Sequence, residues 1–166
     1  MKTMFFAILL LGSLSGHTSG TTLAFLQKYP AINQRDSDQW IYPQQLKSAT
    51  QEIRRVVSTN RLVDIHALFE KLLSDSSHFY FNVDELTDYA GTLIKQQVQT
   101  AIRILNETLR LFPKSVETAM LLGEAYEETG NRYMARQVYE EAMTLKPDPT
   151  LTYILLKKLS LLISID

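Results

Sequence analysis

From residue 48 onward, apolar residues recur every three or four positions, which is the spacing of one face of an α-helix. Residues 61–73 show the pattern most clearly, with Ile65, Leu68, Phe69 and Leu72 on one face. No segment alternates apolar and polar residues as a half-buried strand does. The pattern therefore predicts an all-α protein, with helices over residues 48–59, 61–73, 83–96, 98–112, 116–129, 132–145 and 149–163.

Capping residues set several of these limits. Asn82 and Ser115 can each accept a hydrogen bond from the backbone of a helix that begins one residue later. Gly130 is expected to end a helix, because glycine adopts the left-handed conformation of a C-terminal cap without steric cost. Asp148 followed by Pro149 pairs an N-cap with a proline in the first turn, so a last helix is expected to begin there.

The first twenty residues have the composition of a secretory signal peptide. Lys2 supplies a positive charge, residues 4–11 are continuously apolar, and the small residues Ser13 and Ser15 have the spacing of a cleavage site. An uncleaved anchor and a buried strand are the alternatives, although the apolar run is shorter than the ~20 residues that span a bilayer. We therefore expect an exported protein, periplasmic or secreted, with no Cys for attachment to lipid.

Residues 21–47 show no sustained periodicity and are predicted to form an irregular arm or linker. A short helix over residues 22–29 would be stopped by Pro30. Trp40 and Tyr42 are expected to pack this arm onto the helical domain.

Two consecutive pairs of helices repeat each other at a period of 33–34 residues. Four positions in each helix recur: Leu86, Tyr89, Ala90 and Leu93 as Ala119, Leu122, Gly123 and Tyr126, and Ala101, Leu105, Thr108 and Pro113 as Ala135, Tyr139, Ala142 and Pro147. Small residues such as Ala90 and Gly123 let the two helices of a hairpin approach closely. This self-similarity is typical of helical repeat arrays, in which neighbouring hairpins stack to bury their apolar faces.

The repeated residues resemble the tetratricopeptide repeat family. The resemblance rests on Leu122-Gly123-x2-Tyr126, Ala135-x3-Tyr139-x2-Ala142 and Pro147, with Ala119 where the family has a large aromatic residue. It covers residues 116–149 most fully, 83–115 with fewer matches, and 48–82 as a degenerate helical hairpin. It implies a short array of two to three repeats followed by a capping or oligomerisation helix over residues 150–166.

A second resemblance extends over residues 79–149, where Phe81-x3-Glu85-Leu86 precedes the repeats. In this feature the chain is similar to the tetratricopeptide tails of some bacterial serine hydrolases of the penicillin-recognising kind. Those enzymes carry their chemistry in a separate large domain, for which 166 residues leave no room. The resemblance implies an accessory role beside such an enzyme.

The composition and motifs argue against both a nucleic-acid binder and an enzyme. The 17 Lys and Arg residues and 18 Asp and Glu residues give a net charge of −1, whereas a nucleic-acid binder needs a basic surface. The chain has no Cys, and neither Ser-x-x-Lys nor His-Glu-x-x-His occurs. His17, His66 and His78 have no partner at metal-ligand spacing. We therefore expect no catalytic residue, metal, cofactor, nucleic acid or small-molecule substrate.

The family resemblance implies a binding groove instead, lined by the first helix of each hairpin. The corresponding residues are mostly acidic, with one adaptable methionine, and they are Asp84, Thr87, Asp88, Gly91, Glu117, Met120, Glu124 and Glu127. The Lys and Asn with which some family members clamp a C-terminal carboxylate are absent. The expected partner is therefore a neutral or basic protein segment. The alternative is that these acids only stabilise helix starts and keep the protein soluble.

The last helix is unusually apolar. Its apolar residues surround much of the circumference, interrupted by Lys157 and Lys158, and they are Leu151, Ile154, Leu155, Leu156, Leu159, Leu161, Leu162, Ile163 and Ile165. We expect this helix to pack on the preceding hairpin. Pairing with a second copy to form a homodimer is the second interpretation, and contact with a membrane surface is the third.

Taken as a whole, the sequence predicts an exported, non-catalytic helical-repeat adaptor that binds a protein partner. The alternatives are an accessory subunit of an envelope serine hydrolase and a structural oligomer built through the C-terminal helix.

Overall fold

The computed structural model describes residues 46–59 and 63–163. The predicted signal peptide at 1–20, Trp40 and Tyr42 lie outside these residues. The described elements are β1 (Lys47–Ser48), α2 (Ala49–Thr59), α3 (Ile65–Ser74), β2 (Phe79–Tyr80), α4 (Val83–Leu93), α5 (Val98–Leu111), α6 (Val116–Glu128), α7 (Arg132–Thr144) and α8 (Pro149–Ile163). The predicted all-α fold class is confirmed.

The predicted caps form at most helix ends. The side-chain oxygen of Asn82 accepts the Glu85 amide at 3.0 Å, and that of Ser115 accepts the Thr118 amide at 3.3 Å. Gly130 follows the end of α6 and adopts the left-handed conformation expected of a C-terminal cap, with a φ of 74°. Two predicted limits are wrong by more than one residue. Helix α3 begins at Ile65 because Asp64 caps it, and α4 ends at Leu93, whose carbonyl accepts the Gln97 amide at 2.7 Å.

The expectation that no strand occurs is wrong for two short segments. Strands β1 and β2 pair in parallel, with Lys47 opposite Phe79 and Ser48 opposite Tyr80. The hydroxyls of Ser48 and Tyr80 both donate to the carboxylate of Glu85, which fixes this pairing against α4. Each strand has two residues, too few for an alternating pattern to appear in the sequence.

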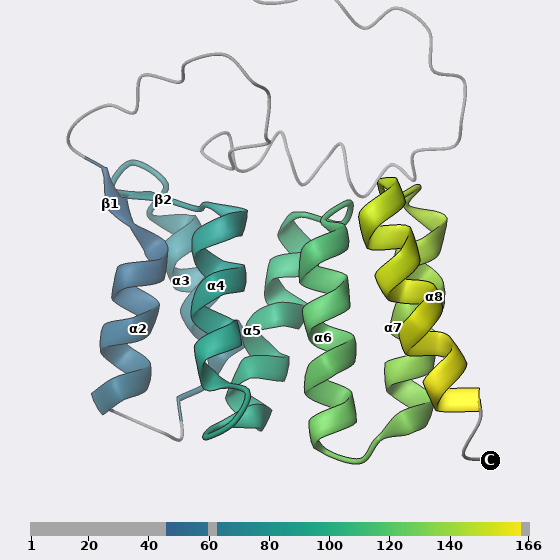
Figure 1. Ribbon diagram of the computed structural model, residues 1–166. Coiled ribbons are helices and arrows are strands. Elements are labelled where there is room, and N and C mark those ends of the chain that lie inside the picture. The colour runs from purple at the N-terminus through teal and green to yellow at the C-terminus, as the bar shows by residue number, and fades with distance from the viewer. Residues whose placement is uncertain (1–45, 60–62, 164–166) are drawn as a thin grey trace, which may run out of the picture.

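The helices stack in chain order, as in a helical array. Figure 1 shows α2, α4, α6 and α8 standing side by side in front, with α3, α5 and α7 behind them. Helices α4 and α5, α5 and α6, α6 and α7, and α7 and α8 are in contact. One hydrophobic core extends from α2 to α8, and its fully buried residues include Ile53, Phe69, Ile104, Tyr139 and Leu155.

The α6–α7 hairpin is held together by the small residue that the sequence singled out. A Cβ atom added at Gly123 would lie only 2.2 Å from Cε1 of Tyr139, so the tyrosine ring fills the space that glycine leaves. Most of the predicted repeat residues are buried, namely Leu86, Tyr89, Ala90, Leu93, Ala101, Leu105, Leu122, Gly123, Ala135, Tyr139 and Ala142. Tyr126 and Pro147 are partly buried, and Pro113 is exposed.

The first pair of helices is arranged differently. Helix α2 contacts α4 and α3 contacts α5 more extensively than α2 and α3 contact each other. The rings of Phe69 and Phe81 lie 5.7 Å apart between their centroids and anchor α3 beside the segment that leads to α4.

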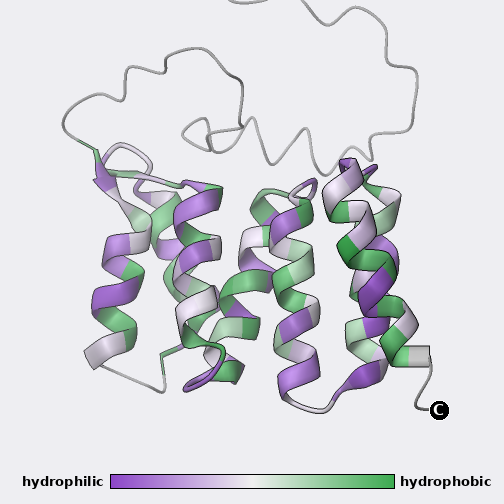
Figure 2. Ribbon diagram, in the orientation of Figure 1, coloured by the Kyte–Doolittle hydropathy of each residue, from purple (hydrophilic) through white to green (hydrophobic). Residues whose placement is uncertain are grey.

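Helix α8 closes the described part of the chain. Figure 2 shows green hydrophobic residues along its visible side, whereas α2 is largely purple. Among the described residues, no helix combines the length and the apolar character that a membrane crossing requires.

Candidate protein-binding site

The eight residues predicted to line a groove lie on α4 and α6, in the layer of first helices. Asp84, Asp88 and Glu117 are exposed there. We call the outward side of α2, α4, α6 and α8 the first-helix surface.

Three of the predicted residues, Thr87, Gly91 and Met120, are partly buried, and two of them contact the neighbouring helix across α4 and α6. The hydroxyls of Thr87 and Thr118 lie 2.7 Å apart and form a hydrogen bond across the two helices. Gly91 lies against Leu121, whose Cδ2 would be 3.3 Å from a Cβ at position 91. Met120 is partly buried against the hydrophobic core. Thr87 and Gly91 thus hold α4 against α6, and all three residues are only partly open to a partner.

The remaining two predicted residues bind a lysine of the same chain. Nζ of Lys158, on α8, lies 3.3 Å from Oε1 of Glu124 and 3.2 Å from Oε1 of Glu127. The hydroxyl of Tyr139 also donates to Glu127. Lys158 therefore balances one of these two negative charges where α6 meets α8.

This cluster shifts the pKa of two of its members. Burial raises the pKa of the Tyr139 hydroxyl, and its bond to the Glu127 carboxylate raises it further. Burial alone would lower the pKa of Lys158, but the carboxylates of Glu124 and Glu127 outweigh it and raise that pKa above its ordinary value. The tyrosine and the lysine thus both hold their protons more firmly in the folded protein.

A hollow of about 550 Å³ lies between α2 and α4 on the first-helix surface. Its lining is entirely polar and consists of Thr50, Gln51, Arg54, Arg55, Ser58, Glu85 and Asp88. Much of this charge is already engaged. Arg55 pairs with Glu52 at 2.6 Å, Glu85 accepts two hydroxyls, and the Arg54 guanidinium lies 4.9 Å from the ring centroid of Tyr89. The hollow therefore presents mainly charged and hydroxyl-bearing side chains, several of which are already paired within the protein.

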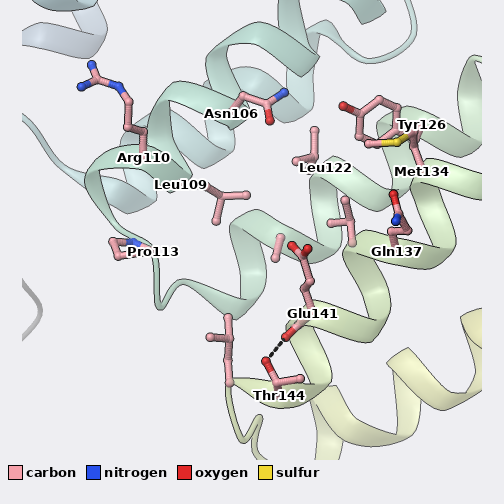
Figure 3. Close-up of a pocket in the computed structure, with 14 residues that line it drawn as sticks. Asn106, Leu109, Arg110, Pro113, Leu122, Tyr126, Met134, Gln137, Glu141 and Thr144 are labelled. Carbon is pink, nitrogen blue, oxygen red and sulfur yellow. Dashed lines mark hydrogen bonds between the residues drawn. The ribbon is translucent and has the colours of Figure 1, made fainter. Parts of the chain in front are cut away.

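A second hollow, also about 550 Å³, lies between α5 and α7 and has part of α6 as its floor. Figure 3 shows Leu109 and Leu122 in this space, with Met134 and Gln137 on the α7 side. We call it the α5–α7 groove, and its lining is Asn106, Leu109, Arg110, Pro113, Ala119, Leu122, Tyr126, Met134, Gln137, Val138, Glu141, Ala142, Thr144 and Leu145.

The rim of the α5–α7 groove carries one open negative charge. Arg110 donates to Glu107 and to Glu70, each at 2.7 Å, so its charge is balanced within the protein. Across the groove, the Glu141 carboxylate forms no ion pair with another residue in the described ranges, and only its backbone carbonyl accepts the Thr144 hydroxyl. The groove thus combines apolar walls with a carboxylate that can form an ion pair with a Lys or Arg of a partner.

Sequence reasoning did not predict this groove, because it considered only the first helix of each hairpin. Leu109 and Met134 could have indicated it, because both are apolar residues of second helices that lie outside the repeated positions.

The described residues contain no group of three or more His, Cys, Asp or Glu side chains that could hold a metal ion. His66 is exposed, and its Nδ1 lies 2.8 Å from Oε1 of Glu107. This pair joins α3 to α5 on the side of the second helices.

The fold and these surfaces define an all-α array of stacked helices. Comparisons with protein-family models, with curated proteins and with solved structures give no match to this chain.

Proposed function

We propose that this protein is a non-catalytic helical-repeat adaptor that binds a segment of another protein in the α5–α7 groove. The observation that carries the proposal is the groove's combination of apolar walls with the carboxylate of Glu141, which forms no ion pair with any residue that the structure describes. Burial of apolar side chains supplies most of the free energy of such binding, and rim charges set orientation and specificity.

The partner segment that fits this groove is an amphipathic helix. A groove between two helices suits a helix whose apolar side chains are spaced three or four residues apart. A Lys or Arg of that helix would lie against Glu141, because Arg110 on the other rim is already paired with Glu107 and Glu70. The proposed partner segment is thus basic, whereas the sequence predicted a neutral or basic one, and it binds the second helices and not the first.

The proposal also includes kinship with tetratricopeptide proteins and export. The 33–34-residue period and the stacking of helices in chain order support the kinship. Lys2 and the apolar run over residues 4–11 support cleavage of a signal peptide, which would place the partner in the periplasm or outside the cell. The mass of the protein recovered from its producing cells tests the cleavage.

Site-specific photo-cross-linking tests the proposed groove. A photoreactive residue is placed at Gln137, which lines the groove, and in a matched variant at Asp88, on the first-helix surface. We expect position 137 to cross-link the partner and position 88 not to do so. Cross-linking from position 88 alone would instead support the first-helix surface. Recovery of a serine hydrolase whose activity changes on adding the protein would support the accessory-subunit alternative.

Charge reversal then tests the role of Glu141 against that partner. We expect Glu141→Lys to weaken binding roughly fivefold, with a larger effect at low salt, because it places like charges together. Glu140→Lys is the matched control: it changes the neighbouring charge, which pairs with Arg136 at 2.8 Å and does not line the groove. Equal effects of the two variants would rule out Glu141 as a contact.

A further inference from the structure

Helix α8 occupies the place of a first helix in the array. It follows α7 after the Pro147-Asp148-Pro149 turn, contacts α7, and reaches α6 through Lys158, as α6 reaches α4 through the Thr87–Thr118 hydrogen bond. In the two repeated hairpins the first helix packs against the second helix that follows it, α4 against α5 and α6 against α7. No second helix follows α8 within residues 46–59 and 63–163.

The repeat period identifies the residues of α8 that such a helix would cover. A shift of 34 positions aligns Tyr153, Leu156 and Lys157 with Ala119, Leu122 and Gly123. In α6, Ala119 and Leu122 are 4% and 3% exposed, and Gly123 lies under the ring of Tyr139 from α7. In α8, Tyr153 is 69% exposed and Leu156 is 54% exposed. Two large apolar side chains are therefore open at the positions that α7 covers in α6.

The charge of Lys157 restricts what can cover this face. Where α6 has Gly123, α8 has an exposed lysine, so a charged side chain stands where the Tyr139 ring of α7 covers α6. An Asp or Glu at that place would instead pair with Lys157. A second copy of α8 does not supply one, because residues 149–163 contain no acidic residue, and it would bring lysines together.

We propose that the face of α8 formed by Tyr153, Leu156 and Lys157 binds an amphipathic helix of another protein, which packs on α8 as α7 packs on α6. The helix places apolar side chains on Tyr153 and Leu156 and an acidic side chain on Lys157. This site is separate from the α5–α7 groove. It binds an acidic helix, whereas the α5–α7 groove is proposed to bind a basic one. A protein with both sites can bring an acidic and a basic helix together.

The test uses the full chain and two stapled helical peptides. Both peptides have the sequence of residues 131–145, the helix that covers α6, with a hydrocarbon staple between positions 136 and 140. One carries Tyr139→Glu and the other Tyr139→Lys. Fluorescence anisotropy at low salt measures their affinities for the wild-type protein and for the Lys157→Glu variant, whose fold is checked by circular dichroism.

We expect the wild type to bind the peptide with Tyr139→Glu about tenfold more tightly than the peptide with Tyr139→Lys, because an opposite charge close to Lys157 stabilises the complex and a like charge destabilises it. The Lys157→Glu variant should reverse this preference, and Leu156→Asp should weaken the Glu peptide about tenfold through loss of apolar contact. Unchanged binding of the Glu peptide to a Leu109→Glu variant separates this site from the α5–α7 groove. Equal affinity of both peptides for both proteins, or no binding at millimolar peptide, would overturn the proposal. Sedimentation as a dimer that Leu156→Asp dissociates would overturn it too, in favour of a second copy.

Discussion

The α6–α7 hairpin and the α2–α3 pair show two ways of packing consecutive helices. In the first, Gly123 lies directly under the ring of Tyr139, and the turn between the helices is closed by Gly130 in a left-handed conformation. In the second, α2 and α3 pack mainly on α4 and α5, and the β1–β2 pairing and the Phe69–Phe81 contact fix their ends.

The two pairs differ in the size of their buried side chains. The buried residues of α2 and α3 are mostly bulky, such as Ile53, Val57, Leu68 and Phe69, and these helices pack mainly on α4 and α5. Glycine and alanine in α6 and α7 allow a closer approach. A tight hairpin therefore depends on one small residue, whereas the looser pair depends on several large contacts with the next unit.

Substituting Gly123 with Leu should have the largest effect on stability. The leucine side chain would have to occupy the space of the Tyr139 ring, which is fully buried and cannot move outward. We expect a loss of about 5 kcal/mol in the free energy of unfolding, above the usual ~1–3 kcal/mol of overpacking. Urea denaturation followed by circular dichroism measures it.

The double variant Gly123→Leu with Tyr139→Ala is the control for overpacking. Removing the ring makes room for the leucine, so the double variant should be more stable than Gly123→Leu alone. If Tyr139→Ala gives no rescue, then contact with this ring is not what makes glycine necessary.

The looser pair should respond most to loss of an aromatic anchor. Phe81 is buried and its ring lies against that of Phe69, so Phe81→Ala removes contacts of α3 and leaves a cavity. We expect a loss of about 3 kcal/mol, with hydrogen exchange faster in α2 and α3 than in α6 and α7. The partly exposed Phe79, in the same short segment, supplies the control, because Phe79→Ala should cost less than half as much. Uniformly faster exchange in all helices would show that the two regions unfold as one unit.

The sequence was sufficient to predict the tight hairpin because its determinants are local or periodic. Gly130, Ser115 and Asn82 act on their own helix ends, and Gly123 and Tyr139 stand at repeated positions. The β1–β2 pairing was missed because it joins two-residue segments that lie far apart in the chain. The looser packing of α2 and α3 was missed because the degenerate unit was taken to have the same geometry as its neighbours.

The prediction of the acidic surface omitted contacts between successive first helices. Stacking places equivalent repeat positions side by side, so Glu124 meets Lys158 34 residues later, and Lys95 meets Glu128 33 residues later. The same period that predicted the fold thus contained the information that part of the acidic surface is paired. Which acids remain open to a partner depends on such pairs and not on the count of charges along one helix.

Removal of the Tyr139 hydroxyl should have a smaller effect, and one that depends on pH. Tyr139→Phe keeps the ring against Gly123 but removes the donor to Glu127, which still pairs with Lys158. We expect a loss of about 1 kcal/mol at neutral pH, the typical contribution of one hydrogen bond. Thermal melts between pH 7 and pH 11 measure it.

The sign of the pH effect follows from the raised pKa of Tyr139. Above about pH 10, the ordinary value for tyrosine, the unfolded chain releases this proton while the folded protein keeps it, so stability falls as the pH rises. Lys158, whose pKa is also raised, acts in the same direction. The Tyr139→Phe variant should therefore lose stability less steeply than the wild type above pH 10. Parallel curves would exclude the Tyr139–Glu127 contact as a source of alkaline sensitivity.

Gly91→Ala should have the smallest effect and the opposite sign. Gly91 also lies in a first helix, in the last turn of α4, but a Cβ there would meet only the end of the Leu121 side chain, at 3.3 Å, and Leu121 is partly exposed and can shift. Alanine favours the helix by up to ~1 kcal/mol over glycine, so after this adjustment we expect a gain of about 0.5 kcal/mol. The same change at Gly123 should be destabilising, because its Cβ would lie 2.2 Å from a buried ring. If Gly91→Ala were also clearly destabilising, α4 and α6 would tolerate an added methyl group no better than α6 and α7 do. Tight packing would then not be confined to the α6–α7 hairpin.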